Sequence, residues 1–228
     1  MEQKKRVFYS EAAYVIGIIC IQISISLMEK ADFGLSMIVA PAYLLYLRIS
    51  EFLPFFTFGV ASYTMQGIVL LLMCLTLKRF RISYLFSFVT AVVGGYILDG
   101  FLYLLSFYTF DAMWSRIVMF AAGTVICCIG VAFMFRTYIP PESYDLFVKE
   151  VSKNFGIRQD RFKQAYDCTS CVVSVIFSFC FFGFGHFEGV KLGTVVCALV
   201  NGPMIGLFGR LYDRYFRFER LIKQKING

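Results

Sequence analysis

Hydrophobic residues run along this chain in six long stretches that carry few or no charged side chains. The stretches cover residues 12–28, 55–77, 82–105, 117–135, 168–185 and 192–209. Each is close to the ~20 residues that an α-helix needs to cross a bilayer. The pattern predicts an all-α fold, a polytopic six-span membrane helix bundle that forms a single transmembrane domain over residues 1–228.

Two shorter segments interrupt the series of spans. Residues 33–47 are apolar but contain Pro41 and are too short to span, so we expect a re-entrant or interfacial helix there. Pro140 and Pro141 predict the start of a helix over residues 142–155, and Gly156 is suited to end it. Its apolar stripe comprises Tyr144, Phe147, Val148, Val151 and Phe155, and its polar face Glu142, Asp145, Lys149 and Lys153. This amphipathic pattern predicts a helix that lies on the cytoplasmic membrane surface.

The order of elements is the same in both halves of the chain. Residues 1–111 and 112–228 each contain a span, a short lateral helix and two further spans, in opposite orientations. Residues 91–95 (AVVGG) also resemble residues 198–202 (ALVNG) at an offset of 107. We interpret the order as a 3+3 inverted repeat, and the alternative is chance similarity between glycine- and alanine-rich apolar runs.

The positive charges fall mainly on one side of the predicted membrane. The chain carries 22 Lys and Arg against 15 Asp and Glu. With a cytoplasmic N-terminus, only Lys30, Arg48, Arg116 and Lys191 fall outside. This positive-inside bias predicts that both termini are cytoplasmic. It also accounts for the net charge of +7 without nucleic acid.

Sequence motifs for catalysis or metal binding are missing from the chain. The eight cysteines lie in or at the edges of the spans, where cysteine behaves as a small hydrophobe. Nothing matches a zinc-protease helix, a nucleophile elbow or a phosphate-binding loop. We therefore expect no enzyme activity, no cofactor, no catalytic residues and no metal site.

Several motifs together resemble the YczE/YitT-like family of small bacterial integral membrane proteins. They are Gly34-Leu35-Ser36 with Pro41, Gly94-Gly95-Tyr96-Ile97-Leu98-Asp99, Pro140-Pro141-Glu142-Ser143-Tyr144-Asp145-Leu146, Tyr166-Asp167, and Gly193-Thr194 through Gly202-Pro203. The resemblance covers most of the chain, but residues 37–41 depart from it by lacking a polar or aromatic pair near the glycine. It implies a location in the bacterial plasma membrane and no particular biochemical activity.

The sixth span carries the strongest indication of a site. Pro203 has no N–H to donate to the carbonyl of Leu199, and such a kink is tolerated where protein or a wet cavity takes up the freed group. Small residues recur at Ala91/Gly95/Asp99 and Ala198/Gly202/Gly206, so we expect the third and sixth spans to cross at the centre and frame a pocket. The predicted substrate-binding residues are Asp99, Gly95, Gln66, Asn201, Gly202 and Pro203.

Three further polar residues are candidates for gating or ion coupling. Asp167 is placed at the cytoplasmic start of the fifth span, where a helix-capping role alone would suffice for an aspartate. His186 and Glu188 are placed at the outer end of that span, where a polar loop at the headgroups is the simpler interpretation. Asp99 is expected to be hydrogen-bonded rather than to face lipid, because an ionised carboxylate is costly there.

The sequence therefore predicts a small transporter or permease of the bacterial plasma membrane, with its site between the third and sixth spans. The alternatives are a non-transporting scaffold or regulatory protein that docks through residues 142–155, and a ligand-capture subunit of a larger transport complex. The expected partners are the lipid bilayer and an unidentified small molecule or ion. A homo-oligomeric or protein partner is also compatible with the sequence.

Overall fold

The computed structural model describes residues 6–108, 112–183 and 190–221, and most of them are helical. The elements in chain order are β1 (Arg6–Tyr9), α1 (Ser10–Ala31), α2 (Ala40–Ser50), α3 (Phe58–Leu77), α4 (Ile82–Leu105), α5 (Met113–Met134), α6 (Ser143–Phe155), α7 (Gln159–Phe182), α8 (Leu192–Tyr215) and β2 (Phe216–Glu219). Six of these helices, α1, α3, α4, α5, α7 and α8, are long and apolar enough to cross a membrane. The protein is a six-span helical bundle, as the hydrophobic pattern predicts.

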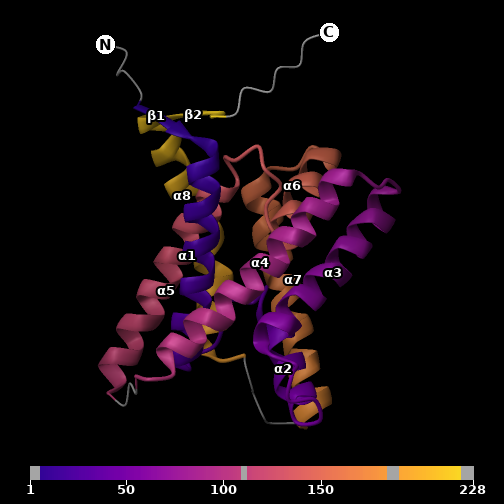
Figure 1. The fold of residues 1–228 in the computed structure, drawn as a ribbon, viewed down its shortest axis with the longest axis vertical. Helices are drawn as coiled ribbons and strands as arrows, with labels where there is room; N and C mark the ends of the chain where they lie inside the picture. Colours follow the sequence, from indigo (N-terminus) through magenta and orange to yellow (C-terminus); the bar gives the residue numbers. More distant parts are fainter. Residues whose placement is uncertain (1–5, 109–111, 184–189, 222–228) are drawn as a thin grey trace.

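The two ends of the described chain meet at one end of the bundle, which we call the terminal end (Figure 1, top). There β1 and β2 form a short parallel pair in which Arg6 lies opposite Phe216. Phe8 of β1 packs against Phe133, with the ring centroids 5.6 Å apart. This pairing joins the start of the first span to the end of the last, and the hydrophobic pattern does not predict it.

The most extensive helix contact among the described elements is that between α1 and α5. Glycine permits this close approach, because a Cβ on Gly130 would lie only 2.9 Å from the carbonyl oxygen of Gly17. The main partners of α4 are α3 and α1, and those of α8 are α7 and α5. The expectation that the third and sixth spans cross at the centre is therefore wrong.

Helix α2 lies at the end of the bundle opposite the termini, and α6 lies at the terminal end (Figure 1). Both are too short to span and both pack against α3 and α7. Gly156 adopts a left-handed conformation with φ 66° and ends α6, as predicted.

The first turns of α6 are buried within the bundle, which the amphipathic pattern does not predict. Glu142 and Asp145, which the amphipathic pattern assigns to a polar face, are each only 5% exposed. The helix packs into the bundle against α3, α7 and α4, so both of its faces are covered near its start. An amphipathic pattern describes only residue types, and these carboxylates find buried partners that the pattern cannot reveal.

The fifth span also begins earlier than predicted. Helix α7 starts at Gln159, nine residues before the apolar run at Cys168. Its first turns contain Lys163 and Asp167, which form an ion pair inside the bundle. Because these charges neutralise each other, the helix continues through a segment that hydropathy alone assigns to a loop.

Candidate functional site

A buried carboxylate at the start of α6 is the centre of the candidate site. Glu142 directly follows Pro140 and Pro141 and is the N-cap residue of α6. Its Oε1 accepts a hydrogen bond from Gln22 Nε2 at 2.6 Å, and its Oε2 accepts one from Gln66 Nε2 at 3.1 Å. Gln22 and Gln66 lie near the middle of the spans α1 and α3. The start of α6 therefore lies deep in the bundle, where the chain brings three elements together around one carboxyl group.

The orientation of the Gln66 amide is fixed by α6 itself. The backbone N–H of Ser143 donates to Gln66 Oε1 at 3.0 Å, which directs the NH₂ group of Gln66 toward Glu142. Gly94 on α4 leaves space for this arrangement, since a Cβ there would lie 2.7 Å from Glu142 Oε1. Gly94 therefore provides the space that the Glu142 carboxyl group occupies.

Burial changes the acid–base behaviour of Glu142. Loss of hydration raises the pKa of this carboxyl to about 8, and the nearby Asp145 carboxylate adds to the effect. The hydrogen bonds from Gln66 and Gln22 favour the charged form and act in the opposite direction. The carboxyl group can therefore exchange a proton near neutral pH.

A buried ion cluster lies next to Glu142. Lys163 Nζ is 3.1 Å from Asp167 Oδ1 and 3.7 Å from Asp145 Oδ1. All three residues are at most 5% exposed. Charges are retained at such positions only when they are paired, because transfer out of water costs several kcal/mol per ion. One ammonium here compensates two carboxylates, Asp145 on α6 and Asp167 on α7.

The cluster also contains polar atoms whose hydrogen-bonding capacity is unused. Ser143 Oγ, Tyr144 OH and Asp167 Oδ2 are buried and have no hydrogen-bond partner among the residues that the structure describes. Buried groups of this kind are usually satisfied by water, an ion or a ligand. Their concentration around Glu142 and Lys163 marks a place where such a species would be bound.

A central cavity of about 40 Å³ adjoins this cluster. Its walls come from α1, α3, α5, α7, α8, the segment before α2 and the start of α6, and include Ser36, Ser62, Cys127, Glu142, Tyr144, Asp145, Lys163, Asn201 and Ile205. A cavity of this size holds one or a few water molecules rather than an organic substrate. Isoleucine and valine side chains form much of the remaining wall, so the polar cluster borders a small, largely apolar space.

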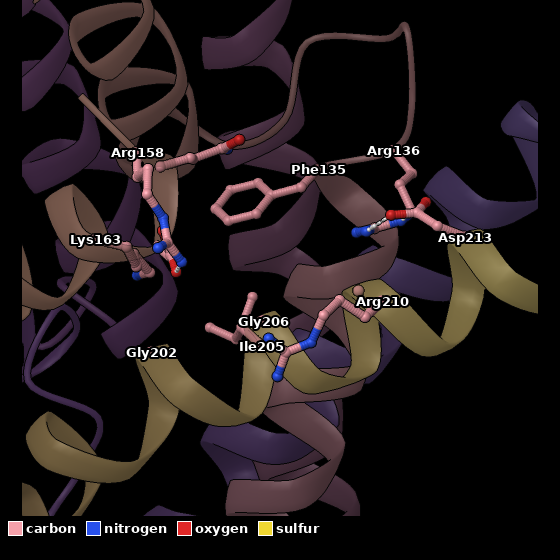
Figure 2. A pocket seen from close by; sticks show the side chains of 12 residues that line it. Phe135, Arg136, Arg158, Lys163, Gly202, Ile205, Gly206, Arg210 and Asp213 are labelled. Carbon is pink, nitrogen blue, oxygen red and sulfur yellow. Dashed lines mark hydrogen bonds and ion pairs between the residues drawn. The ribbon is translucent and has the colours of Figure 1, made fainter. Parts of the chain in front are cut away.

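A much larger cleft of about 440 Å³ opens beside the central cavity, between the end of α5, the start of α7 and the second half of α8. Figure 2 shows Arg158 and Lys163 on one side of it, Arg136 and Asp213 on the other, and Ile205 and Gly206 on its floor. Lys163 and Ile205 border both the cleft and the central cavity. These two residues therefore separate the cleft from the buried cluster.

The cleft carries more positive than negative side chains. Arg136, Arg158, Lys163 and Arg210 line it together with the carboxylates Asp160 and Asp213. Arg136 makes two short hydrogen bonds to Asp213, of 2.7 and 2.6 Å, which hold that wall in place. Arg136, Arg158 and Lys163 are all in ion pairs, so Arg210 is the lining cation that is free to bind an anion among the described residues.

The structure brings together part of the predicted substrate-binding set. Gln66 binds Glu142, and Asn201 lines the central cavity, where its side chain is 3.6 Å from Cys128 Sγ. Gly202 lines the cleft, and Pro203 lines an adjoining cavity of about 340 Å³. These residues lie around the cluster, although α8 is one continuous helix through Pro203 rather than two segments.

Asp99 and Gly95 lie elsewhere, in the seam between α3 and α4. Asp99 accepts hydrogen bonds from Thr57 Oγ1 at 2.7 Å and from the backbone N–H of Gly59 at 2.9 Å. A Cβ on Gly95 would lie 2.9 Å from the Gly59 carbonyl oxygen. Asp99 is hydrogen-bonded, as predicted, but it caps the start of α3 and borders neither the central cavity nor the cleft.

The three gating candidates have different outcomes. Asp167 does not cap a helix start as expected, because it lies in the third turn of α7, fully buried against Lys163. The positions of His186 and Glu188 lie outside the described residues.

The sequence pattern does not reveal the residues that dominate the cluster. It assigns Glu142 and Asp145 to a solvent-facing stripe and Lys163 to a loop. One available signal is the spacing of Lys163 and Asp167, which is four residues and typical of a helical ion pair. Another is Pro140-Pro141 directly before Glu142, which places a helix start and an acid at the same point.

Comparison with known proteins gives a family without an assigned activity. No curated protein and no solved structure matches the chain. Residues 8–210 match a family described as "Family of unknown function (DUF6198)". That match does not name the YczE/YitT-like proteins, so this resemblance stays an expectation from the sequence motifs. The match covers all six spans and the buried cluster, and the chain therefore belongs to the Family of unknown function (DUF6198).

Proposed function

We propose that this protein is a transporter or permease for a small molecule or ion in the bacterial plasma membrane, with both termini in the cytoplasm. The observation that carries the proposal is the position of Lys163. It borders a cleft at the terminal end and also the central cavity beside Glu142, so Lys163 and Ile205 separate a wide opening from the middle of the bundle. Ionisable groups at such depth are typical of substrate or ion pathways.

The helix arrangement supports an inverted repeat, which many transporters share. The starts of α1 and α5 are 103 residues apart in the chain, and so are the starts of α2 and α6. Helix contacts also correspond when the halves are exchanged. Helix α3 packs against α4, α2 and α6, and α7 packs against α8, α6 and α2, while α4 contacts α1 and α8 contacts α5.

Residue contacts support the same correspondence. A Cβ on Gly95 would meet the Gly59 carbonyl oxygen and the Tyr63 ring. At the related seam, a Cβ on Gly202 would meet Gln164 and, at 3.7 Å, the Asp160 carbonyl oxygen. Gly95 and Gly202 are 107 residues apart, which is the offset found in the sequence. Gly59 and Tyr63 precede Asp160 and Gln164 by 101 residues each.

The two seams differ in a way that alternating access would require. The α3/α4 seam is closed, because Asp99 binds the start of α3 at Thr57 and Gly59. The residue at the corresponding position of α8 is Gly206, and a Cβ there would meet nothing within 4 Å. The α7/α8 seam therefore contains the cleft. We interpret this conformation as open to the cytoplasm and closed to the outside.

The proposed coupling group is Glu142. Its carboxyl can exchange a proton near neutral pH, and it lies beside the cavity where a substrate or ion would pass. Proton relays in membrane transporters commonly use such carboxylates. Asp145, Lys163 and Asp167 would then form the inner gate, whose ion pairs rearrange when the cleft becomes continuous with the cavity.

Water access to the cleft within the membrane is the first test. In a cysteine-free background, Gly206→Cys should react with a membrane-impermeant maleimide from the cytoplasmic side only. Leu207→Cys is the matched control, because Leu207 is 55% exposed on the same helix and does not line the cleft, so it should face lipid and stay unlabelled. Equal labelling of both variants, or of neither, would argue against an aqueous pathway.

Transport itself is tested with the reconstituted protein. Compounds that raise the melting temperature of the purified protein in a metabolite library would be measured for uptake into proteoliposomes under an imposed proton gradient. We expect gradient-dependent accumulation that Glu142→Gln abolishes. Binding without accumulation would support the ligand-capture alternative. The scaffold alternative is weakened already, because α6, its assumed docking element, is largely buried.

A further inference from the structure

Two arginines that line the cavity adjoining the cleft have side chains without a partner among the described residues. Neither Arg161 nor Arg210 forms a side-chain hydrogen bond or ion pair with any residue in the described part of the chain. Arg210 lines both the large cleft and the adjoining cavity, and Arg161 lines the latter. Unpaired guanidinium groups that face a shared opening provide donors for an anion without first breaking an internal ion pair.

Arg158 adds a third guanidinium that can be recruited. It is bound to Asp160, with Nη2 2.5 Å from Oδ2, and both side chains are exposed by more than a third. An exposed ion pair between residues two apart contributes little stability, so an incoming anion can compete for Arg158. By contrast, Arg136 is held by Asp213 and serves as a fixed wall.

The three arginines border one cavity between the start of α7 and the second half of α8. Helix α8 has 24 residues and is therefore ~36 Å long, which exceeds the ~30 Å hydrocarbon core. Arg210 is five residues before its end, and Arg158 and Arg161 are at the start of α7, at the same end of the bundle. Arg210 therefore lies near the boundary of the hydrocarbon core, and the long side chains of Arg158 and Arg161 line the same cavity from α7.

Part of the wall that α8 contributes beside the arginines is formed by glycines. Gly202 and Gly206 line this part, and a Cβ on Gly206 would meet nothing within 4 Å. The opening therefore continues from the charged mouth toward the middle of α8. An anionic head at the mouth with an elongated remainder along the glycines would fit this shape.

We propose that the cleft and its adjoining cavity bind a phosphate-bearing ligand, whose phosphate oxygens accept hydrogen bonds from Arg158, Arg161 and Arg210, the three arginines of the adjoining cavity. The guanidinium group matches phosphate geometry, and basic pockets between spans on the cytoplasmic side are typical phosphate or phospholipid sites. The phosphate belongs either to an anionic lipid headgroup, with an acyl chain along Gly202 and Gly206, or to a soluble phosphate compound that enters from the terminal end. The site does not depend on whether the protein transports.

The experiment measures the melting temperature of the full-length, delipidated protein in neutral detergent. One arm titrates inorganic phosphate against sodium chloride of equal ionic strength, and the other titrates phosphatidylglycerol against phosphatidylcholine in mixed micelles. Stabilisation by phosphate identifies a soluble source. Stabilisation by phosphatidylglycerol alone identifies a lipid source. If neither raises the melting temperature above its matched blank, the proposal is wrong.

Arginine variants show whether the effect arises in the cleft. Arg210→Gln should weaken the apparent affinity about tenfold or more, because charge-assisted hydrogen bonds to the phosphate are lost. Arg214→Gln is the matched control, since Arg214 is exposed one turn later on α8 and lines neither cavity, and it should bind like the wild type. Should Arg210→Gln fail to fold, Arg161→Gln replaces it, because this exposed side chain has no structural partner among the described residues. Equal affinity of these cleft variants and the control would overturn the assignment.

Discussion

At the scale of single residues, the structure is organised around a carboxyl group that the hydrophobic pattern assigns to a surface. The pKa of Glu142 is raised to about 8 by burial, against 4.5 for an ordinary glutamate. Between these values the folded protein holds a proton that the unfolded chain releases. The free energy of unfolding therefore falls as pH rises through this range, by up to ~1.4 kcal/mol per pH unit for one such group.

Glu142→Gln should remove this share of the pH dependence. The amide keeps the shape of the side chain but cannot release a proton. Wild type and variant should have similar melting temperatures at about pH 5, and the variant should become the more stable one toward pH 8. Burial also raises the pKa of Asp145, so a smaller slope of the same sign should remain in the variant. If the melting temperatures of wild type and variant instead change in parallel between pH 5 and pH 8, Glu142 is ionised in the folded protein.

Gly94 allows a matched steric test of the same cluster. A Cβ at this position would lie 2.7 Å from Glu142 Oε1 and 2.8 Å from Gln22 Nε2, so Gly94→Ala should destabilise the protein by about 1–3 kcal/mol. Gly100 is on the same helix, and a Cβ there meets nothing within 4 Å. Gly100→Ala should therefore be neutral or stabilising by up to ~1 kcal/mol. Thermal unfolding in detergent measures both, and similar changes in the two variants would contradict the tight packing around Glu142.

The residues of the cluster differ in how far the sequence could predict them. Gln66 and Asn201 are predictable because an uncharged polar side chain within a span is uncommon and usually hydrogen-bonds across helices. Glu142, Asp145 and Lys163 are not, since a charged residue near a span end is usually solvated, and the sequence does not show which short helix enters the bundle. Their burial depends on partners from α1, α3 and α7, which only the tertiary structure brings together.

At the scale of elements, the first question is whether Pro203 in α8 contributes to the stability of the protein. Pro203 is exposed and leaves the carbonyl of Leu199 without its helical hydrogen-bond donor. Pro203→Ala restores this bond and loses little packing, so its melting temperature should equal or exceed that of the wild type. Pro41→Ala is the comparison, because Pro41 lies in the first turn of α2, where the missing N–H costs nothing, and no gain is expected. A less stable Pro203→Ala protein would mean that the proline is needed for folding.

The start of α3 depends on a side chain from α4. Asp99 accepts hydrogen bonds from Thr57 Oγ1 and the Gly59 N–H, which would otherwise face the seam unpaired. Asp99→Ala should lower the free energy of unfolding by about 1–3 kcal/mol, because it removes both acceptors. Asp99→Asn retains an acceptor oxygen and should lose less. If both variants melt like the wild type, Asp99 does not hold the seam closed.

Hydropathy predicts an element boundary well where the end of an apolar run coincides with the end of a helix. The third span is predicted at residues 82–105, and α4 is Ile82–Leu105. The fifth span is predicted to start too late because its first turns carry paired charges, which a hydropathy criterion cannot distinguish from solvated ones. The β1–β2 pair escapes prediction, since four-residue strands at a chain end have no periodic signal.

At the scale of the whole molecule, the fold makes the predicted topology specific enough to test. The terminal end of the bundle contains β1, β2 and α6, and the opposite end contains α2 (Figure 1). An even number of spans returns the chain to its starting side, and the excess of Lys and Arg at the terminal end favours a cytoplasmic location for that end. The number of spans is six because α2 and α6 do not cross the bundle.

Reporter fusions measure this arrangement directly. Fusions after Arg81 and Gly156 should report a cytoplasmic location, and fusions after Phe52 and Phe107 an external one. The Phe52 fusion is decisive for α2, because a spanning α2 would return residue 52 to the cytoplasm and reverse the location of Arg81. The Gly156 fusion tests α6, because a spanning α6 would place residue 156 outside. The fusion after Phe107 is the external reference for this comparison. A cytoplasmic signal at Phe52, or an external one at Gly156, would contradict both the six-span count and the inverted repeat on which the proposed pathway rests.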